Sequence, residues 1–373
     1  MFEEDKFLLE ELKVTRNLQD KTVEGYKYAI ISYTEYCEQS MCSLIDEAEQ
    51  EEIQGVRWKM RRLRKRLLGF RAYLMEKYDY ASTVNIRFKL ILTIYRHFEI
   101  ELQPLPPIST RNKEKEFVMY EELPTMDIIR KAVAVSDLKM KAIILFIASS
   151  GTDRAGTTNL TVNDFLIATK EYHNTDDIQE ALLRLDESED IIPTWKLRRQ
   201  KTNKAYFTFS TPESTQAIVN YLSNTSRRLK GSSLLFDITP NYLTSRLGDL
   251  NARLQLGKVG KYNRFRCHML RKFHASQLAT GINALTRTEI DALQGRSKEN
   301  VHKSYYMDNP LDLKKKYARN IDKVTIFSTK KTISSESKEY QELLDKYERL
   351  QADIKEAARQ EVKNILQELG YKL

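Results

Sequence analysis

The chain has 373 residues, of which 41% are hydrophobic and 30% are charged, a composition that supports packed cores and excludes a wholly disordered chain. Lys and Arg outnumber Asp and Glu by 61 to 52, and the net charge of +9 suits a polyanionic partner, because each phosphate contact releases condensed counterions. The longest apolar run near a helix core, residues 142–148, is far too short to span a bilayer, so we expect no membrane span.

The cysteine content indicates a reducing compartment. Three cysteines occur, Cys37, Cys42 and Cys267, and an odd, small number in a long chain is not a disulfide framework. Cys37 and Cys42 have no neighbouring His or Cys that would complete a zinc site. The acidic residues 3–5 are untypical of a secretory signal. We therefore expect reduced thiols in a cytoplasmic protein.

Residues 1–102 are predicted to form a helical domain. Thr22 can cap a first long helix, residues 51–78 place apolar side chains at helical spacing, and Thr83 starts another helix. Eight cations fall within 15 residues of the stretch 51–78 with no acid between them, so contact with phosphates explains them better than a solvated face does. These cations are Arg57, Lys59, Arg61, Arg62, Arg64, Lys65, Arg66 and Arg71.

A linker is predicted over residues 103–117, because two prolines break helix there and the charged run that follows offers nothing to bury. A second domain is predicted over 118–328. It opens with helices, including one over 136–150 with an apolar face of isoleucines, and helices are expected to continue to about Asp322.

A β-hairpin is the exception to this helical pattern. Residues 192–197 and 205–209 have strand composition and flank the turn 201–204. Thr211 and Pro212 then restart helix as N-cap and first helical residue.

Residues 334–370 are predicted to form an amphipathic helical tail. Its apolar residues alternate by four and three over a few heptads, which makes it a short coiled-coil candidate. They are Leu343, Tyr347, Leu350, Ile354 and Ala357.

Four separated stretches carry residues suited to phosphate chemistry. Arg154 follows an apolar helix and a glycine turn, and Lys201 stands at the predicted hairpin tip. His268 and Arg271 are three apart and share one face of a helix. Gly295-Arg296 begins a polar segment that ends in the pair 305–306 of tyrosines. Each signal alone has an ordinary structural explanation, such as a capping arginine or a core tyrosine, so the order and spacing of all four are the evidence.

In that order, these residues resemble the tyrosine recombinase (phage integrase) family. The family has an arginine after an apolar helix, a hairpin lysine, a His-x-x-Arg motif, a His or Trp after Gly, and a tyrosine nine or ten residues further on. The resemblance covers about residues 10–325, and Arg296 together with the helical tail looks like the archaeal and archaeal-virus branch. It implies a mainly α fold, with an N-terminal helical core-binding (SAM-like) domain and a mostly helical catalytic domain that contains a small β-hairpin.

The resemblance also implies the roles of the site residues. Arg154 and Arg271 would donate forked hydrogen bonds to the phosphate. Lys201 would protonate the departing 5′ oxygen, His268 would act as base or orient the phosphate, and Arg296 could only stabilise charge. The implied catalytic set is Arg154, Lys201, His268, Arg271, Arg296 and Tyr306, with Tyr305 as the alternative nucleophile. His274 is interpreted as a packing residue or a further phosphate contact beside Arg271.

The implied activity is site-specific recombination of double-stranded DNA through a 3′-phosphotyrosyl intermediate, by a homotetramer on two DNA sites and without metal or cofactor. Two departures from the family pattern are Arg296 itself and Thr157, which stands where an acidic residue often supports the first arginine. They leave open a catalytically inactive DNA-binding regulator on the same fold. A type IB topoisomerase, which shares the chemistry, is the other alternative.

Overall fold

The computed structural model describes residues 1–113, 118–200, 203–281, 283–296 and 309–327. The chain divides into two compact units, Met1–Phe117 and Val118–Leu373. Helices dominate both units and the described strands form two small antiparallel pairs, so the predicted mainly α fold is confirmed. Across the described ranges, no helix is both long and apolar enough to cross a membrane. The predicted tail over 334–370 lies outside the described residues.

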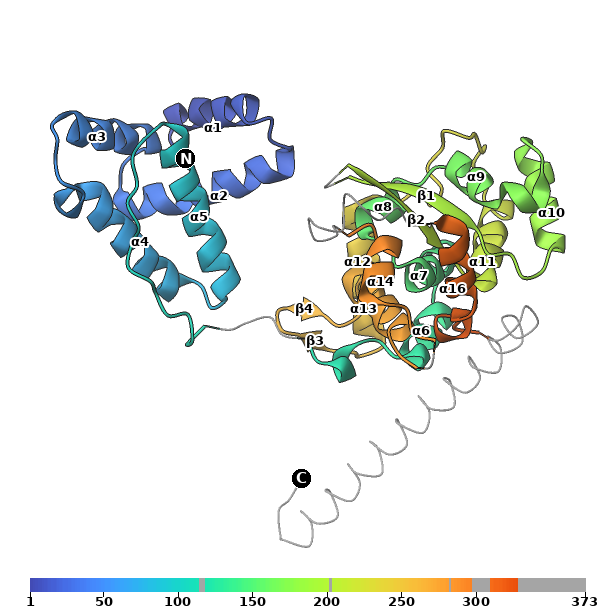
Figure 1. The fold of residues 1–373 in the computed structure, drawn as a ribbon. Coiled ribbons are helices and arrows are strands. Elements are labelled where there is room, and N and C mark those ends of the chain that lie inside the picture. Colours follow the sequence, from blue (N-terminus) through green and yellow to red (C-terminus); the bar gives the residue numbers. More distant parts are fainter. Residues whose placement is uncertain (114–117, 201–202, 282, 297–308, 328–373) are drawn as a thin grey trace, which may run out of the picture. The chain divides into compact units, whose positions relative to one another are not determined.

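The first unit is a bundle of helices around one apolar core (Figure 1). In the core, the Tyr33 ring lies edge-on to Phe70, with ring centroids 4.8 Å apart, and its hydroxyl is 3.1 Å from that of Tyr95. The helix α5 packs against both α2 and α4. The elements of this unit are α1 (Glu3–Thr15), α2 (Asp20–Cys37), α3 (Met41–Ile53), η1 (Trp58–Met60), α4 (Arg62–Lys77) and α5 (Ala81–His97).

Several helix boundaries in this unit differ from the predicted ones. Thr22 and Thr83 lie inside the first turns of α2 and α5 instead of capping them. The helix expected over 51–78 is two helices, because Gly55 has a φ of +67° just after α3 and ends it. Arg61 fastens the connection by donating to the carbonyl of Val56 at 2.9 Å.

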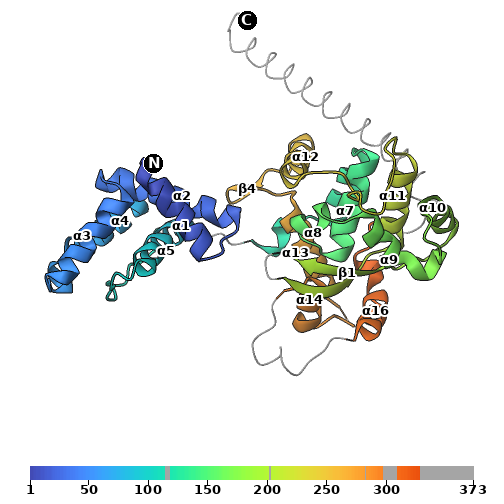
Figure 2. The ribbon, with the colours of Figure 1, turned by 90° about the horizontal axis from the view of Figure 1, so that it is seen from above.

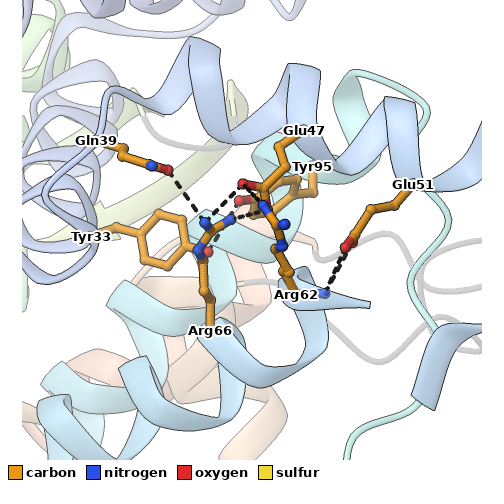
Figure 3. Close-up of polar contacts among 7 residues, drawn as sticks. All are labelled: Tyr33, Gln39, Glu47, Glu51, Arg62, Arg66 and Tyr95. Carbon is orange, nitrogen blue, oxygen red and sulfur yellow. Dashed lines mark hydrogen bonds and ion pairs between the residues drawn. The ribbon is translucent and has the colours of Figure 1, made fainter. Parts of the chain in front are cut away.

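Half of the basic run in this unit has partners within the unit, and Figure 3 shows Arg62 and Arg66 with theirs. Arg66 donates to both carboxylate oxygens of Glu47 at 2.5 and 2.9 Å, and Arg62 reaches the same carboxylate at 3.3 Å. Although burial opposes ionisation, the bond from Arg66 holds the pKa of Glu47 below its ordinary value. Arg61 pairs with Glu52 at 2.5 Å, and Arg71 donates to a linker carbonyl. Acids absent from the run itself are therefore supplied by the preceding helix α3.

The second unit is built around α7, which Figures 1 and 2 show in its middle. The helix packs against α6, α11, α13 and β2, and nearly all its residues are buried, on every side and not on one apolar face. The elements of this unit are η2 (Tyr120–Glu122), α6 (Met126–Ala134), α7 (Leu138–Ser150), α8 (Arg154–Thr158), α9 (Val162–His173), α10 (Ile178–Glu187), β1 (Thr194–Arg199), β2 (Lys204–Phe209), α11 (Pro212–Ser223), α12 (Pro240–Arg253), β3 (Lys258–Val259), β4 (Tyr262–Asn263), α13 (Cys267–Leu278), α14 (Arg287–Leu293), α16 (Pro310–Ala318) and η3 (Ile321–Lys323).

The predicted hairpin is present, with strand bounds shifted by one or two residues. The strands β1 and β2 are antiparallel, and Arg199 lies directly opposite Lys204 at the end near the turn. Trp195 anchors the hairpin in the core, where its ring lies edge-on to Phe146 at 4.9 Å. The helix after it begins at Pro212, as predicted.

The expectation that only helices follow was wrong at β3 and β4. These two-residue strands pair in antiparallel fashion across a turn at Gly260, which has a φ of +58°. Gly257, just before β3, also has a positive φ, of +72°. Such positive φ values favour glycine.

Candidate active site

The first arginine of the predicted set begins a short helix directly after the buried helix α7. Gly151, with a φ of +64°, ends α7, and the Asp153 carboxylate caps α8 by accepting from the Gly156 N–H at 2.7 Å. Arg154 is the first residue of α8, and its Nη1 donates to the Thr244 hydroxyl of α12 at 2.7 Å. The glycine that ends α7 and the aspartate that caps α8 therefore determine where the Arg154 side chain is attached relative to the core.

The carbonyls at the end of α7 accept hydrogen bonds from side chains of three other elements. The Ser149 carbonyl accepts from the Tyr317 hydroxyl of α16 at 2.9 Å, and the Ser150 carbonyl accepts from Thr208 of β2 at 2.7 Å. The next carbonyl, of Gly151, accepts from Arg271 of α13 at 2.5 Å. Three consecutive carbonyls without helical partners are thus satisfied by side chains.

Arg271 is the most deeply buried arginine of the predicted set, with 5% of its surface exposed. Its Nη1 donates to the Gly151 carbonyl and its Nη2 to the Gln294 carbonyl, both at 2.5 Å. Burial lowers the pKa of Arg271 to about 10, and the nearby Asp153 carboxylate opposes that shift. No carboxylate in the described part of the chain forms an ion pair with it. Within the described ranges, the site therefore holds a buried cation without a paired anion.

His268 stands one turn before Arg271 and is exposed at the surface of α13. Partial desolvation of the imidazole lowers its pKa, and the positive charges of Lys272, Arg266, Arg271 and Arg296 lower it further. The ring is therefore neutral at neutral pH and can accept a proton.

Arg296 leaves a tight turn at the end of α14. Gly295 has a φ of +61°, and a Cβ at that position would lie 2.6 Å from the ring of Tyr206. The Arg296 backbone N–H donates to the Asp291 carbonyl at 2.8 Å, and its guanidinium lies 3.4 Å from the Asp291 carboxylate. The chain then enters residues 297–308, outside the described ranges.

Two cations of the hairpin, which the sequence analysis did not single out, clamp this turn. Lys204 donates to the Arg296 carbonyl at 2.8 Å, and Arg199 donates to the Gly295 carbonyl at 3.4 Å. Arg199 also lies 3.7 Å from the Asp153 carboxylate. The signal in the sequence was a basic residue at each end of the predicted turn 201–204: Arg199 lies just before it and Lys204 is its last residue.

The structure brings four of the predicted residues into one region. The charge of Arg154 acts on the Cys267 thiol beside His268, although burial dominates and raises the pKa of that thiol to about 12. His268, Arg271 and Arg296 act on one another through their charges. Lys201, Tyr305 and Tyr306 lie outside the described residues.

Two further residues that the sequence singled out, His274 and Thr157, lie in the described structure. His274 is completely buried, which agrees with an interior residue and not with a phosphate contact. Thr157 is also buried, and its hydroxyl donates to the Asp153 carbonyl at 2.9 Å. An acidic residue does lie near the arginines, but it is Asp153, one residue before Arg154, and not a residue at position 157.

No protein-family model and no curated protein matches the sequence. Among solved structures, the XerH site-specific recombinase bound to palindromic difH substrate, a post-cleavage complex, matches 83% of this chain and 82% of its own, with 15% identity and a TM-score of 0.51. The XerA recombinase matches 85% and 98%, with 17% identity and a TM-score of 0.33. The integrase from mycobacterium phage Brujita matches 87% and 93%, with 13% identity and a TM-score of 0.34.

The expected resemblance is thereby confirmed at the level of the fold, while the archaeal branch stays a prediction. Of these three structures, only the XerH complex has a TM-score above one half. Its match extends over most of both chains. This chain has the fold of the tyrosine recombinases.

Proposed function

We propose that this chain is a site-specific DNA recombinase, an integrase that cuts and rejoins DNA through a 3′-phosphotyrosyl intermediate. The observation that supports this most is Arg271, a buried guanidinium that no described carboxylate pairs with, in a region that also holds Arg154, Arg296 and His268. A buried cation of this kind is stabilised by an anionic ligand, and a phosphodiester fits a cluster of guanidinium forks.

The geometry suits stabilisation of charge on the phosphate. A guanidinium has five N–H donors, and Arg271 uses two of them on carbonyls, so three remain for phosphate oxygens. Arg154 and Arg296 would add donors from α8 and from the turn after α14. Donors that are fixed before the reaction stabilise developing charge without reorganisation.

The proton transfers fall to His268 and Lys201. The tyrosine hydroxyl, of Tyr306 or alternatively Tyr305, loses its proton to the neutral His268 and attacks phosphorus. As the new oxygen–phosphorus bond forms, the bond to the 5′ oxygen breaks, and that oxygen takes a proton from Lys201. Attack by a 5′ hydroxyl of the partner strand reverses these steps. The reaction needs no metal or nucleotide cofactor, because the phosphotyrosine conserves the bond energy.

The first unit would hold the duplex through the cations of its basic run that have no internal partner. Arg57, Lys59, Arg64 and Lys65 form no ion pair with the described residues, and three of them are exposed. In the proposed organisation, residues 1–102 bind double-stranded DNA, 103–117 link, and 118–328 catalyse. A homotetramer on two DNA sites would cleave one strand per partner, with the tail 334–370 contacting a neighbouring subunit, in the cytoplasm.

Covalent trapping tests this proposal. A nicked duplex carrying a candidate site is incubated without metal with the wild type, Tyr305→Phe and Tyr306→Phe, and run on a denaturing gel. We expect a protein–DNA band that only Tyr306→Phe loses. Loss in Tyr305→Phe alone would move the nucleophile by one residue.

Two other outcomes would replace the proposal. Tight DNA binding with no covalent band on a library of duplexes would favour the inactive regulator. A covalent band on any sequence, with relaxation of supercoiled plasmid and no strand exchange, would favour the topoisomerase.

A further inference from the structure

Arg271 and Gln294 each bind the main chain of the other. The Nη2 of Arg271 donates to the Gln294 carbonyl at 2.5 Å, and the Nε2 of Gln294 donates to the Arg271 carbonyl at 2.9 Å. Both side chains are buried. These reciprocal bonds form a closed ring between α13 and the end of α14, and the guanidinium is part of that ring.

His274, three residues after Arg271 on α13, extends this ring. Its Nδ1 lies 3.0 Å from the Nε2 of Gln294, whose amide nitrogen carries two hydrogens. One hydrogen goes to the Arg271 carbonyl, so the other points to Nδ1, which must be unprotonated. Turning the amide around would set two acceptor oxygens against each other. Consistently, burial lowers the pKa of His274 to about 3, so the ring is neutral, with its proton on Nε2.

The same pair packs under the loop that holds the other end of the guanidinium. A Cβ at Gly151 would lie 2.5 Å from Nδ1 of His274 and 2.8 Å from Nε2 of Gln294. The Gly151 carbonyl is the acceptor for Nη1 of Arg271. Gln294 therefore supplies one of the two carbonyls that fix the guanidinium, and Gln294 and His274 both lie against Gly151, which supplies the other.

We propose that Gln294 and neutral His274 are positioning residues that hold Arg271 in the orientation needed for strand cleavage, an inference that rests on the proposed function. A space-filling role alone does not explain Gln294 and His274. Over the described ranges, Oε1 of Gln294 and Nε2 of His274 are buried without a hydrogen-bond partner. Two apolar side chains would fill the volume without leaving such atoms, so the polar pair is explained by what the two N–H groups of Gln294 hold in place.

A double-mutant cycle tests the inference. Gln294→Leu removes both amide donors, and we expect its single-turnover cleavage rate to fall about 100-fold, the effect of a displacement on the order of 1 Å at a reacting group, while the DNA dissociation constant stays within about 2-fold. In an Arg271→Lys background, the same change should lower the rate by less than about 3-fold, because its target is already gone.

The control is His173→Leu, which removes another buried histidine of the same unit. Its Nε2 lies 3.1 Å from the Leu166 carbonyl and its Nδ1 accepts from the Thr175 N–H at 3.3 Å, on α9. We expect it to lower the thermal midpoint and leave the cleavage rate of the folded fraction unchanged. Gln294→Met, which keeps the length of the side chain, replaces Gln294→Leu if the latter does not fold.

Nitrogen NMR of the full-length protein tests the tautomer without any assay of activity. We expect the His274 imidazole to carry its proton on Nε2 and to show no titration between about pH 5 and 8, where an ordinary histidine titrates. A proton on Nδ1, or titration in that range, would overturn the inference. So would a wild-type cleavage rate in Gln294→Leu, which leaves the proposed function standing. A wild type that forms no covalent complex on any duplex would overturn the proposed function itself.

Discussion

At the scale of single residues, the site depends on how Arg271 is bound inside the protein. Its two terminal nitrogens reach carbonyls of two different loops, 2.5 Å away in each case. A lysine has a single point of charge and cannot bridge two acceptors in fixed directions as a planar guanidinium does. Retaining the charge alone should therefore not retain the function.

We expect Arg271→Lys to lower the single-turnover cleavage rate about 100- to 1,000-fold, which is the usual cost of losing a preorganised donor. Covalent-complex formation on a nicked duplex measures this rate. The control is Arg253→Lys, since Arg253 is an exposed arginine of α12 that donates to a carbonyl far along the chain, at 3.3 Å. A mutant as fast as the wild type would show that Arg271 serves only the fold.

A second residue-scale prediction concerns Glu213, a buried carboxyl that accepts from the backbone N–H groups of Ile326 at 2.6 Å and Phe327 at 2.7 Å. Burial raises its pKa to about 7, against an ordinary value of 4.5. Between these values the folded state holds a proton that the unfolded state has lost, so stability falls as pH rises from about 4.5 to 7 and levels off above. The full change is about 3 kcal/mol.

Urea unfolding of the wild type and Glu213→Gln across this pH range measures the effect. The neutral amide cannot titrate, so the difference in unfolding free energy between the two proteins should change with pH and flatten above about pH 7. A difference independent of pH would show that the carboxyl titrates alike in both states.

At the scale of elements, the hairpin, the turn after α14 and the end of α7 are joined into one cluster by direct contacts. The Gly295 turn packs against the ring of Tyr206 on β2, and the two cations at the hairpin end hold its carbonyls. Cations placed directly opposite one another in a hairpin repel, and here each is bound to a carbonyl acceptor instead. The position of the hairpin is thereby tied to the position of Arg296.

Gly295→Ala should lower the free energy of unfolding more than an alanine substitution at another glycine of similar conformation does. Gly257 also has a positive φ, of +72°, but no atom lies within 4 Å of a Cβ there. Gly257→Ala should therefore cost only the backbone strain, about 1–2 kcal/mol. At Gly295 the clash with Tyr206 should add about 1–3 kcal/mol. Equal losses in urea unfolding would contradict the predicted clash.

Lys204→Met removes the donor to the Arg296 carbonyl and keeps the apolar stem of the side chain. We expect cleavage to slow about 5-fold, because the hydrogen bond contributes on the order of 1 kcal/mol to placing Arg296. Lys196→Met, at an exposed lysine of β1 in the same hairpin, should leave the rate unchanged. Equal rates for the two variants would exclude a role for this bond.

The sequence predicted elements wherever the pattern is local. The apolar run of α7 and the strand composition around the hairpin are such patterns, and Thr211-Pro212 correctly predicted a helix start. The break at Gly55 and the β3–β4 pair were missed, because each depends on the backbone conformation of one or two glycines. Gln294 and Lys204 could not be found at all, since their contacts join residues 23 and 92 positions apart.

At the scale of the whole molecule, two units of different character share one chain. The first divides its basic run between internal acids and open surface, and the second places Arg199 and Arg296 near Arg271. The charge pattern of the sequence alone could not distinguish cations that pair with internal acids from cations that are open to a ligand. Only the packing of α3 against α4 shows that Glu47 and Glu52 neutralise part of the run.

Replacing Arg57, Lys59 and Lys65 together with glutamine should weaken DNA binding and lower the slope of log K against log salt by about 0.9 for each DNA phosphate that the protein no longer neutralises. Anisotropy titrations at several salt concentrations measure that slope. Arg66→Gln is the matched control, because Arg66 already binds Glu47 and its replacement should lower stability and leave the slope unchanged. A triple variant with the wild-type slope would exclude this surface from DNA binding.

The three carbonyls at the end of α7 also bear on how the protein is made. Their donors come from 58, 120 and 168 residues further along the chain, in Thr208, Arg271 and Tyr317. During synthesis, α7 leaves the ribosome long before the last of these donors exists. Three long loops must close, each at a cost in entropy, before all three carbonyls at the end of the helix have hydrogen-bond donors. A nascent chain that stops before Tyr317 therefore has all of the described site residues and still lacks a finished core beneath them.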